Sequence, residues 1–486
     1  MKRINRWKYI LLAFTIMILY LLIRMTCWNL NERWIENGML AVLFMIVAGN
    51  GVLLRQKRWS SQCLLVSILL AGCVMRIGYM LYTGCEIRSH DMYDFSSDSY
   101  GHAAYLLKLI EKHQLPETNE IQFYQQPFFY LVGAVVSKGI NGLLGSSNPY
   151  DYVDAAKLVS CFVSCATVFL TERLCDILKI KEKGKIAATA IVAFLPSFYL
   201  MGGRVNCDAL AVYFMALSIY YTIVWTEDMS WKNTILLAVI YGLGVMTKIS
   251  CGIPALVTAG VFVWKLVQEL RKKKGLSLLL KYLVFGCISL PLGLWYSLRN
   301  YHLFGQKLTY VLMLNENSTL YCGNHSYVQR FFSIGIKNLL ETPYAEPFGD
   351  YNFPTYLVKS ALFGEFKYAV SDFFPILLLI AGVTIAGLFV YAYYWQGKRI
   401  LRGEAESQTT LLAVNGLVLI GSAVIFCIKY AFGCSMDFRY YGIFAVICAV
   451  LFGEMLEQSQ SEGVKHFGSG AVLLFGIASC CMYIMV

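Results

Sequence analysis

Long apolar runs separated by short polar loops dominate this chain, and their length predicts membrane-spanning helices. A helix needs about 20 predominantly apolar residues to cross the hydrocarbon core. The pattern predicts an all-α polytopic membrane protein with about 13 transmembrane helices, within a range of about 12 to 14. The predicted spans are residues 8–25, 38–54, 62–83, 152–178, 185–202, 209–225, 234–249, 251–267, 278–298, 373–395, 409–432, 440–455 and 467–486.

Composition agrees with this class and excludes a soluble globular protein. Hydrophobic residues make up 58% of the 486 positions and charged residues only 15%, which lies well outside the range of soluble domains. The net charge of +11 does not indicate nucleic-acid binding, because the basic residues sit in short loops beside spans, where they are typical of membrane insertion and contact with anionic lipid. The 16 cysteines lie mostly in apolar runs without metal-ligand spacing and are interpreted as small buried residues.

The positions of lysine and arginine predict the orientation, because cytoplasmic loops retain these residues. Four basic clusters fall on one side if the amino terminus is cytoplasmic: residues 55–58, 179–185, 271–274 and 398–402. The sequence therefore predicts a multi-pass protein of the cell membrane, organised as a single membrane domain over residues 1–486. Two large loops, residues 84–150 and 299–372, then face outward.

Residues 128–144 resist a simple assignment. They are apolar enough to cross the membrane, yet they carry Lys138, Asn141 and three glycines. A full crossing would also place the Lys179 cluster outside. We interpret the segment as a juxtamembrane or re-entrant helix of the first outer loop, and a fourteen-span arrangement remains open.

The first outer loop contains the densest group of candidate site residues. Asp91, Asp94 and Asp98 follow one another at spacings of three and four, and His102 lies four positions beyond. A helical turn would gather these side chains on one side. The segment also resembles a helix start that Ser97 or Asp98 caps, so capping of an interfacial helix is the structural alternative for Asp98.

Further candidates lie at other outward turns. Arg204 and Asp208 stand four residues apart just before a span, where an ion pair at the helix start is the alternative reading. Arg439, followed by Tyr440, precedes another span, and its guanidinium could snorkel to the interface or grip a phosphate with two hydrogen bonds. Arg299 adds another outward cation.

Lys248 lies at the edge of a span, where a charge is costly to bury. Such a residue is a candidate for a functional site, with snorkelling as the alternative. Gln126 follows Tyr124 and Gln125 and stands directly before Pro127 at the start of the apolar segment 128–144.

The order of these features resembles the GT-C superfamily of integral membrane glycosyltransferases. An aspartate on an outer helix is followed by a tyrosine and glutamine before a proline, then by an Asn-x-Asp turn and finally by Phe-Arg-Tyr: Asp98, Tyr124, Gln126, Pro127, Asn206, Asp208, Phe438, Arg439 and Tyr440. Within the superfamily, the likeness is to bacterial relatives of protein O-mannosyltransferases and of lipid A aminoarabinose transferases. The chain departs from the usual pattern in having three predicted spans before the first outer loop.

The resemblance implies a GT-C-like fold and an enzyme that transfers a sugar from a polyprenyl-phosphate donor to an acceptor at the outer membrane face, with inversion. The loop 84–150 would then be catalytic, with Asp98 as general base and His102 orienting or sharing the proton. Asp208 would hold the acceptor or stabilise positive charge on the sugar ring. The implied substrate-binding residues are Asp91, Asp94, Gln126, Arg204, Lys248, Arg299, Arg439 and Tyr440, of which the cations would stabilise the departing phosphate.

The expected partners are a polyprenyl-phosphate-linked sugar, the lipid bilayer and an acceptor that is a protein, a glycolipid or a wall polymer, with no nucleic acid. The aspartates and His102 lack the spacing of known calcium or zinc loops. We therefore assign no metal and no cofactor from the sequence, although members of the superfamily differ in their use of a divalent ion.

Two other functions remain open. A flippase or transporter for lipid-linked saccharides would be expected to carry acidic residues at mid-membrane depth, whereas the acids here gather in outer loops. A membrane polysaccharide polymerase would be expected to carry an arginine-rich outer loop, but the loop 299–372 contains only Arg299 and Arg330.

Overall fold

The structure, a computed structural model, describes residues 6–26, 32–272, 275–308, 310–312 and 314–485. In this part of the chain the regular structure is helical, and the only bridge between extended segments is an isolated one between Tyr321 and Phe432. The predicted all-α class is therefore confirmed.

The long helices follow the predicted spans closely. They are α1 (Arg6–Thr26), α2 (Glu32–Arg55), α3 (Ser61–Tyr82), α7 (Lys157–Ile177), α8 (Glu182–Phe194), α10 (Asp208–Glu227), α11 (Trp231–Thr247), α12 (Ala255–Arg271), α13 (Gly275–Phe304), α16 (Phe373–Leu401), α17 (Ser407–Lys429), α18 (Gly442–Gln458) and α19 (Glu462–Ile484). Shorter elements lie between them: α4 (Gly101–Leu107), η1 (Lys108–Lys112), α5 (Phe128–Leu144), α6 (Pro149–Ala155), α9 (Pro196–Gly202), η2 (Ile249–Gly252), η3 (Val328–Phe332), α14 (Ile336–Glu341), α15 (Phe353–Phe363), η4 (Gly433–Met436) and η5 (Phe438–Tyr440).

Fewer helices than the predicted 13 are both long enough and apolar enough to count as membrane spans. Among the described residues, 10 helices pass this test, or 11 if the bent pair α8 and α9 forms one span. The helices α11 and α18 have 17 residues each, slightly fewer than the hydrocarbon core requires. The chain is a multi-pass membrane protein, while the count of about 13 stays a prediction.

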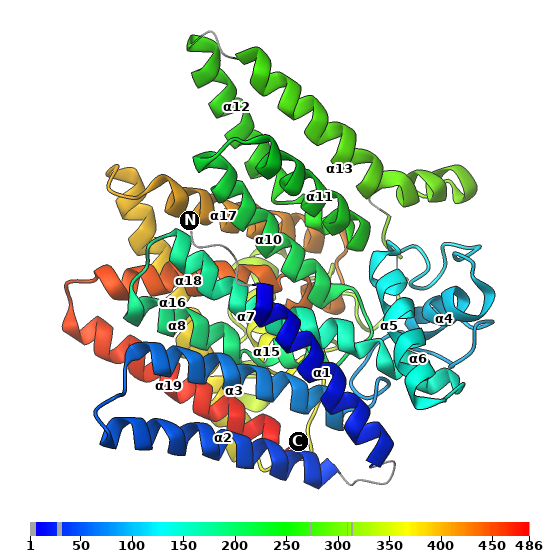
Figure 1. Cartoon of the computed structure of the whole chain (residues 1–486), viewed down its shortest axis with the longest axis horizontal. Helices are drawn as coiled ribbons and strands as arrows, with labels where there is room; N and C mark the ends of the chain where they lie inside the picture. Colours follow the sequence, from blue (N-terminus) through cyan, green and yellow to red (C-terminus); the bar gives the residue numbers. More distant parts are fainter. Residues whose placement is uncertain (1–5, 27–31, 273–274, 309, 313, 486) are drawn as a thin grey trace.

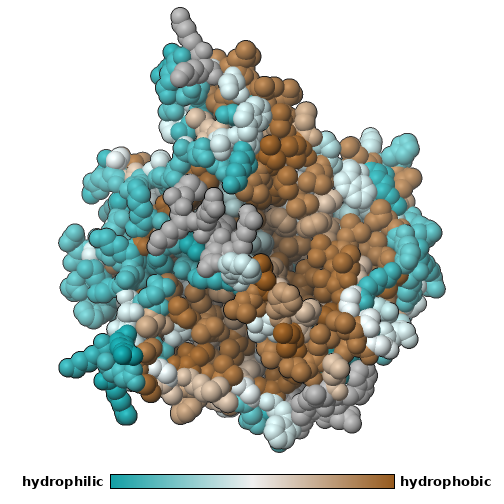
Figure 2. Space-filling model, viewed as in Figure 1, coloured by the Kyte–Doolittle hydropathy of each residue, from teal (hydrophilic) through white to brown (hydrophobic). Residues whose placement is uncertain are grey.

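The helices form one bundle, and its left and right ends in Figure 1 differ. In Figure 1 the turns after α2, α16 and α18 lie at the left end, and α4, α5 and α6 lie at the right end. Figure 2 shows a hydrophobic surface between two hydrophilic rims in the same view. This is the distribution expected of a protein that crosses a bilayer.

Contacts among the connecting loops confirm that the left-hand turns meet. Ser61 donates a hydrogen bond to Glu182, and Lys179 lies 3.8 Å from the carboxylate of Glu406. These loops flank three of the predicted basic clusters. The clusters therefore share one end of the bundle, which we call the basic end, and the end with α4 and α5 is called the loop end.

The helix α5 begins and ends at the loop end. Just before it, Gln126 Nε2 donates to Ser297 Oγ over 2.8 Å near the end of α13. Just after it, Asp151 of α6 pairs with Arg24 near the end of α1. The arrangement agrees with the juxtamembrane interpretation of residues 128–144, because a helix that crossed the bundle would have its ends on opposite sides.

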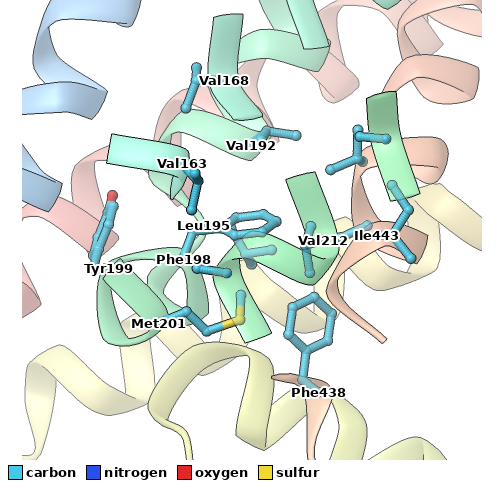
Figure 3. Close-up of a cluster of buried hydrophobic side chains, with 14 of the residues drawn as sticks. Val163, Val168, Val192, Leu195, Phe198, Tyr199, Met201, Val212, Phe438 and Ile443 are labelled. Carbon is cyan, nitrogen blue, oxygen red and sulfur yellow. The ribbon is translucent and has the colours of Figure 1, made fainter. Parts of the chain in front are cut away.

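The core lies where α7, α8, α9 and α10 meet the start of α18 (Figure 3). Val163, Val212 and Phe198 pack there with almost no exposure. Nearby, α8 and α18 touch through glycine: a Cβ atom at Gly184 would lie 2.2 Å from the carbonyl oxygen of Gly453. Small residues at a helix interface allow the close backbone approach on which packing in a membrane depends.

Arg76 of α3 secures the break between α8 and α9, which are bent by 50°. Pro196 has no N–H, so the carbonyl of Val192 four residues earlier loses its helical partner. Arg76 is fully buried and donates to the carbonyl oxygens of Val192, over 2.7 Å, and Ala193, over 2.5 Å. Its position therefore has a structural explanation, because a buried carbonyl without a donor is costly.

Replacing this guanidinium tests that explanation. We expect Arg76→Met to lower the free energy of unfolding by at least about 3 kcal/mol, because several charge-assisted hydrogen bonds to buried oxygens are lost. Thermal unfolding of the purified protein measures the effect. The matched control is Arg55→Met at the exposed end of α2, and equal stability of the two variants would contradict the assigned role.

Candidate functional site

A cavity of about 550 Å³ opens near the loop end of the bundle, and we call it the polar cavity. Its charged and polar lining comes from the first outer loop, the start of α10, the α11–η2 turn and η5. These residues include Asp91, His102, Gln122, Gln125, Asp208, Lys248, Arg439 and Tyr440. Its other walls are apolar and include Met215, Ile249, Ile253, Leu419, Ile420, Phe426 and Phe444. A polar head group attached to an apolar tail would match this division.

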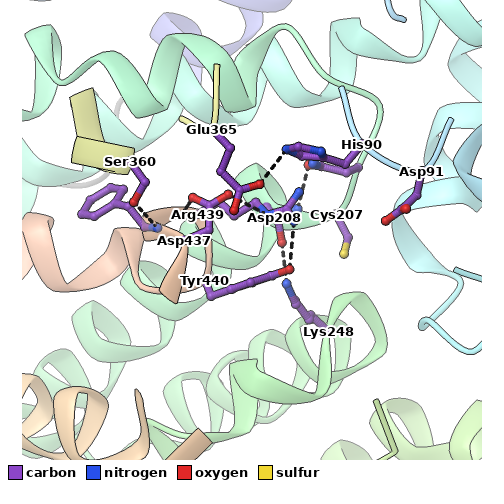
Figure 4. A network of polar contacts seen from close by, with 12 residues as sticks. His90, Asp91, Cys207, Asp208, Lys248, Ser360, Glu365, Asp437, Arg439 and Tyr440 are labelled. Atoms are coloured by element: carbon purple, nitrogen blue, oxygen red, sulfur yellow. Dashed lines mark hydrogen bonds and ion pairs between the residues drawn. The ribbon is translucent and has the colours of Figure 1, made fainter. Parts of the chain in front are cut away.

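Asp208 and Lys248 form the centre of the polar lining (Figure 4). Asp208 is the first residue of α10, where the positive end of the helix dipole favours a carboxylate. Lys248 has extended backbone between α11 and η2. Its Nζ atom donates to Asp208 Oδ1 over 2.5 Å, and both side chains line the cavity. The pairing lowers the free-energy cost of burying these two charges in an apolar region.

Arg439 adds a second cation to this centre. Its Nε atom lies 4.0 Å from Asp208 Oδ2 and 3.1 Å from Asp437 Oδ2. Its Nη2 atom donates to the Tyr440 hydroxyl over 2.9 Å. The Lys248 ammonium lies 4.5 Å from the centre of the Tyr440 ring. Tyr440 therefore holds both cations at the edge of the cavity.

Asp91 enters the cavity from the opposite side. Its Oδ2 atom accepts a hydrogen bond of 2.5 Å from Gln122 Nε2, and its carbonyl accepts one of 2.9 Å from the His102 N–H. Gly101 makes the second contact feasible, because a Cβ atom there would lie 2.3 Å from the Asp91 carbonyl oxygen and its φ is +91°. Figure 4 shows Asp91 across from Asp208, with Cys207 between them.

His102 lies close enough to both aspartates to interact with them electrostatically, and it contacts a tyrosine. Its Nδ1 atom lies 2.6 Å from the Tyr130 hydroxyl. Burial lowers the pKa of His102 to about 4, although Asp91 and Asp208 both act to raise it. The ring is therefore neutral near pH 7, and one of its nitrogens can accept a proton.

Asp98 does not join this group. The helix α4 begins at Gly101, three residues after Asp98, and the preceding segment forms turns. The Asp98 side chain is 80% exposed and pairs with Lys112, and this hydrogen bond lowers its pKa. Asp94 is also exposed and lies outside the cavity lining. The predicted gathering of these aspartates with His102 on one helical face is therefore wrong, because residues 87–99 do not form a helix.

The remaining predicted residues divide into two groups. Gln126 lines the cavity, as Lys248, Arg439 and Tyr440 do. Arg204 and Arg299 lie outside its lining. The Arg204 guanidinium is buried 4.9 Å from the centre of the Phe366 ring, and Arg299 Nη2 donates to the Pro116 carbonyl over 2.9 Å.

Sequence reasoning missed an acidic group beside Arg439. His90 Nε2 lies 3.0 Å from Glu365 Oε2, and the ligand atoms of His90, Glu365 and Asp437 lie within 4.8 Å of one another. Burial and the nearby Glu365 carboxylate raise the pKa of Asp437 to about 6. The group could offer one nitrogen and two oxygens to a metal, but Arg439 already neutralises Asp437, so we describe it as an ion-pair network. An acidic residue within the apolar run 361–366 was the available signal for Glu365.

Comparison with known families supports the resemblance noted from the sequence. The model of the family named dolichyl-phosphate-mannose-protein mannosyltransferase matches residues 126–303. This match confirms the resemblance to the GT-C superfamily. The matched segment includes Gln126, Asp208 and Lys248, whereas Asp91, His102 and Arg439 lie outside it. No curated protein sequence matches the chain significantly.

Solved structures of two membrane transferases align with the fold only loosely. An Archaeoglobus fulgidus oligosaccharyltransferase, tethered to an acceptor peptide with an NVT sequon, aligns at 10% identity and a TM-score of 0.48, and the alignment covers 86% of this chain but only 55% of the archaeal chain. ArnT from Cupriavidus metallidurans, bound to undecaprenyl phosphate, aligns at 13% identity and a TM-score of 0.34, covering 81% of this chain and 77% of ArnT. Both TM-scores lie below 0.5, so neither alignment carries an argument about this chain.

The low pKa of His102 predicts how stability depends on pH. The unfolded chain protonates this histidine near pH 6.5, whereas the folded protein does so only near pH 4. Between these values the unfolded state binds a proton that the folded state does not, so as the pH falls from 6.5 to 4 the stability decreases by about 3 kcal/mol.

We expect His102→Gln to remove most of this loss. The difference in unfolding temperature between wild type and variant, followed from neutral to acidic pH, measures it. His466→Gln, at an exposed histidine in α19, is the control and should keep the wild-type profile. An identical profile in His102→Gln would show that His102 titrates as an ordinary histidine.

Proposed function

We propose that this protein is a membrane glycosyltransferase that moves a sugar from a polyprenyl-phosphate donor to a hydroxyl acceptor in the polar cavity, with inversion at the anomeric carbon. The observation that carries the proposal is the cavity itself, whose lining combines two aspartates and two cations with apolar walls. The family match supports the donor class, since its name specifies a dolichyl-phosphate-linked sugar.

In this reaction Asp91 is the general base, in place of Asp98. The acceptor oxygen attacks the anomeric carbon, the bond from that carbon to the phosphate oxygen breaks, and the acceptor proton passes to the Asp91 carboxylate. Gln122 orients Asp91 through its 2.5 Å hydrogen bond. His102, neutral and held by Tyr130, is the second group that can share the proton.

The departing polyprenyl phosphate gains negative charge as its bond to the sugar breaks. Lys248 and Arg439 are the cations that line the cavity at its polar centre, and preorganised cations of this kind stabilise developing charge without reorganising during the reaction. Asp208 positions both of them, because it contacts Lys248 and lies within ion-pair distance of Arg439. We therefore assign Asp208 to positioning the phosphate-binding cations.

The position of the acids favours an enzyme over a flippase. Asp91 lies in the first outer loop, and Asp208 lies at the end of α10 that faces it. Both therefore belong to the loop end of the bundle. Ion coupling in a transporter uses acids at mid-membrane depth, whereas the acids among the described residues that line this cavity, Asp91 and Asp208, both lie at the loop end. We further propose that the loop end faces outward, as the basic clusters predict.

Two matched asparagine substitutions test the proposal. Offered a panel of undecaprenyl-phosphate-linked sugars and candidate acceptors, the wild-type protein should release undecaprenyl phosphate as it transfers one of the sugars. Asp91→Asn should lower kcat by at least about 100-fold, because the base is lost. Asp98→Asn removes only an exposed ion pair and should change kcat by no more than about twofold.

Thermal unfolding of both variants controls for loss of fold. The reverse result, with activity lost in Asp98→Asn and kept in Asp91→Asn, would identify Asp98 as the general base, as predicted from the sequence. If no donor supports transfer while lipid-linked sugar moves across the membrane of reconstituted vesicles, the protein is a flippase and the proposed enzymatic function is wrong.

A further inference from the structure

A second cavity, of about 660 Å³, lies between α12 and α17 in the part of the bundle nearer the basic end. Its lining is mainly apolar and includes Leu256, Val261, Leu411 and Val418. We call it the α12–α17 cavity. Nothing in the proposed reaction uses it directly, yet α17 and the residues that lead into α12 also line the polar cavity.

The two cavities follow one another along α17 and along the segment that runs from Lys248 through η2 into α12. On the α17 side, the polar cavity is lined within residues 419–429 and the α12–α17 cavity within residues 407–418. On the α12 side, the corresponding residues lie within 248–253 and 256–265. The lining residues therefore continue from one cavity to the next on both walls, without overlap and with almost no gap.

The combined path has the length of a bilayer core. The helix α17 contains 23 residues, and at about 1.5 Å per residue it is about 34 Å long, against about 30 Å for the hydrocarbon core. Lys429 at one end lines the polar cavity, while Ser407 at the other follows Glu406, which pairs with Lys179 at the basic end. The path thus runs from the phosphate-binding centre to the opposite face.

The helix α12 leaves this path open to the membrane. In the segment Ile249–Arg271, which includes α12, only 17% of the most apolar stretch is buried. Within α12 itself, Leu256 and Trp264 are 67% and 50% exposed. Polar residues close the far end, where Gln408 Nε2 donates to Glu227 Oε1 over 3.2 Å. An apolar chain lying in the path would have lipid along one side and polar groups only at its two ends.

We propose that α17 and the continuous segment Ile249–Arg271, which comprises η2 and α12, form one groove for the polyprenyl tail of the donor, and that the far part of this groove, the α12–α17 cavity, selects donors with long tails. The inference rests on the proposed function for the identity of the donor. Its support is the continuity of the groove with the phosphate-binding centre. A short prenyl chain fills only the part beside Ile249 and Ile253, whereas a long chain also reaches the part beside Gly260.

Gly260 offers a precise way to block the far part. It lines the α12–α17 cavity, and a Cβ atom there would meet no atom within 4 Å. Gly260→Leu therefore adds side-chain volume to the lining of the path at a position where a Cβ atom has open space around it. Gly387 of α16 is the matched control, because it is also exposed, also has no atom within 4 Å of a Cβ, and lines neither cavity.

The experiment measures equilibrium binding of undecaprenyl phosphate and geranyl phosphate to the purified full-length protein. Both probes carry the same phosphate and differ only in tail length. We expect the wild type and Gly387→Leu to bind undecaprenyl phosphate at least about tenfold more tightly than geranyl phosphate, because more apolar surface is buried. Gly260→Leu should lose this preference while its affinity for geranyl phosphate stays unchanged.

Each other outcome overturns a defined part of the proposal. Equal affinity of the wild type for both probes, as expected if an ordinary phospholipid occupies the groove, overturns the tail groove but leaves the donor class intact. An unchanged preference in Gly260→Leu, and in Val414→Trp on the opposite wall as a second variant, also overturns it. Failure of the wild type to bind either probe overturns the proposed donor class as well.

Discussion

The structure depends on how an apolar helical bundle accommodates ionised side chains at one end. Moving a single charge from water into an apolar interior is costly, and the cost falls only when partners of opposite charge lie close by. Asp208, Lys248 and Arg439 meet this condition together, since each cation contacts an acidic group and the lysine is held over an aromatic ring. The charge pattern constrains where the helices around the polar cavity begin and end.

Helix termini and breaks are the positions that carry these charges. Asp208 starts α10, Lys248 separates α11 from η2, and Arg439 belongs to the short η5 turn before α18. Backbone groups at helix ends lack intrahelical partners and therefore favour polar surroundings. In the core, Arg76 likewise provides hydrogen bonds at a helix break, because it donates to carbonyl oxygens beside Pro196. Polar chemistry and helix interruption therefore coincide in this protein.

The arrangement also explains how one side of the polar cavity can stay apolar. Ile249 and Ile253 lie in a span candidate that is mostly unburied, and together with α17 they form apolar walls, whereas the walls formed by the first outer loop and η5 are polar. A substrate with a charged head and an apolar tail could then bind without leaving the membrane. This division places a polar wall and an apolar wall within reach of one amphipathic molecule.

The sequence by itself determined the helices and their order, because apolar periodicity and length act locally and each span forms its own backbone hydrogen bonds. It also identified Asp208, Lys248, Arg439 and Tyr440, whose charges or aromatic rings stand at predicted span ends. Only the tertiary structure placed Asp91 in the cavity and Asp98 outside it. The two aspartates lie in an irregular loop whose conformation depends on distant contacts, such as that of Asp91 with Gln122, 31 residues away. Such contacts leave no periodic signal in the sequence, and for the same reason Glu365 and the α12–α17 cavity were not predicted.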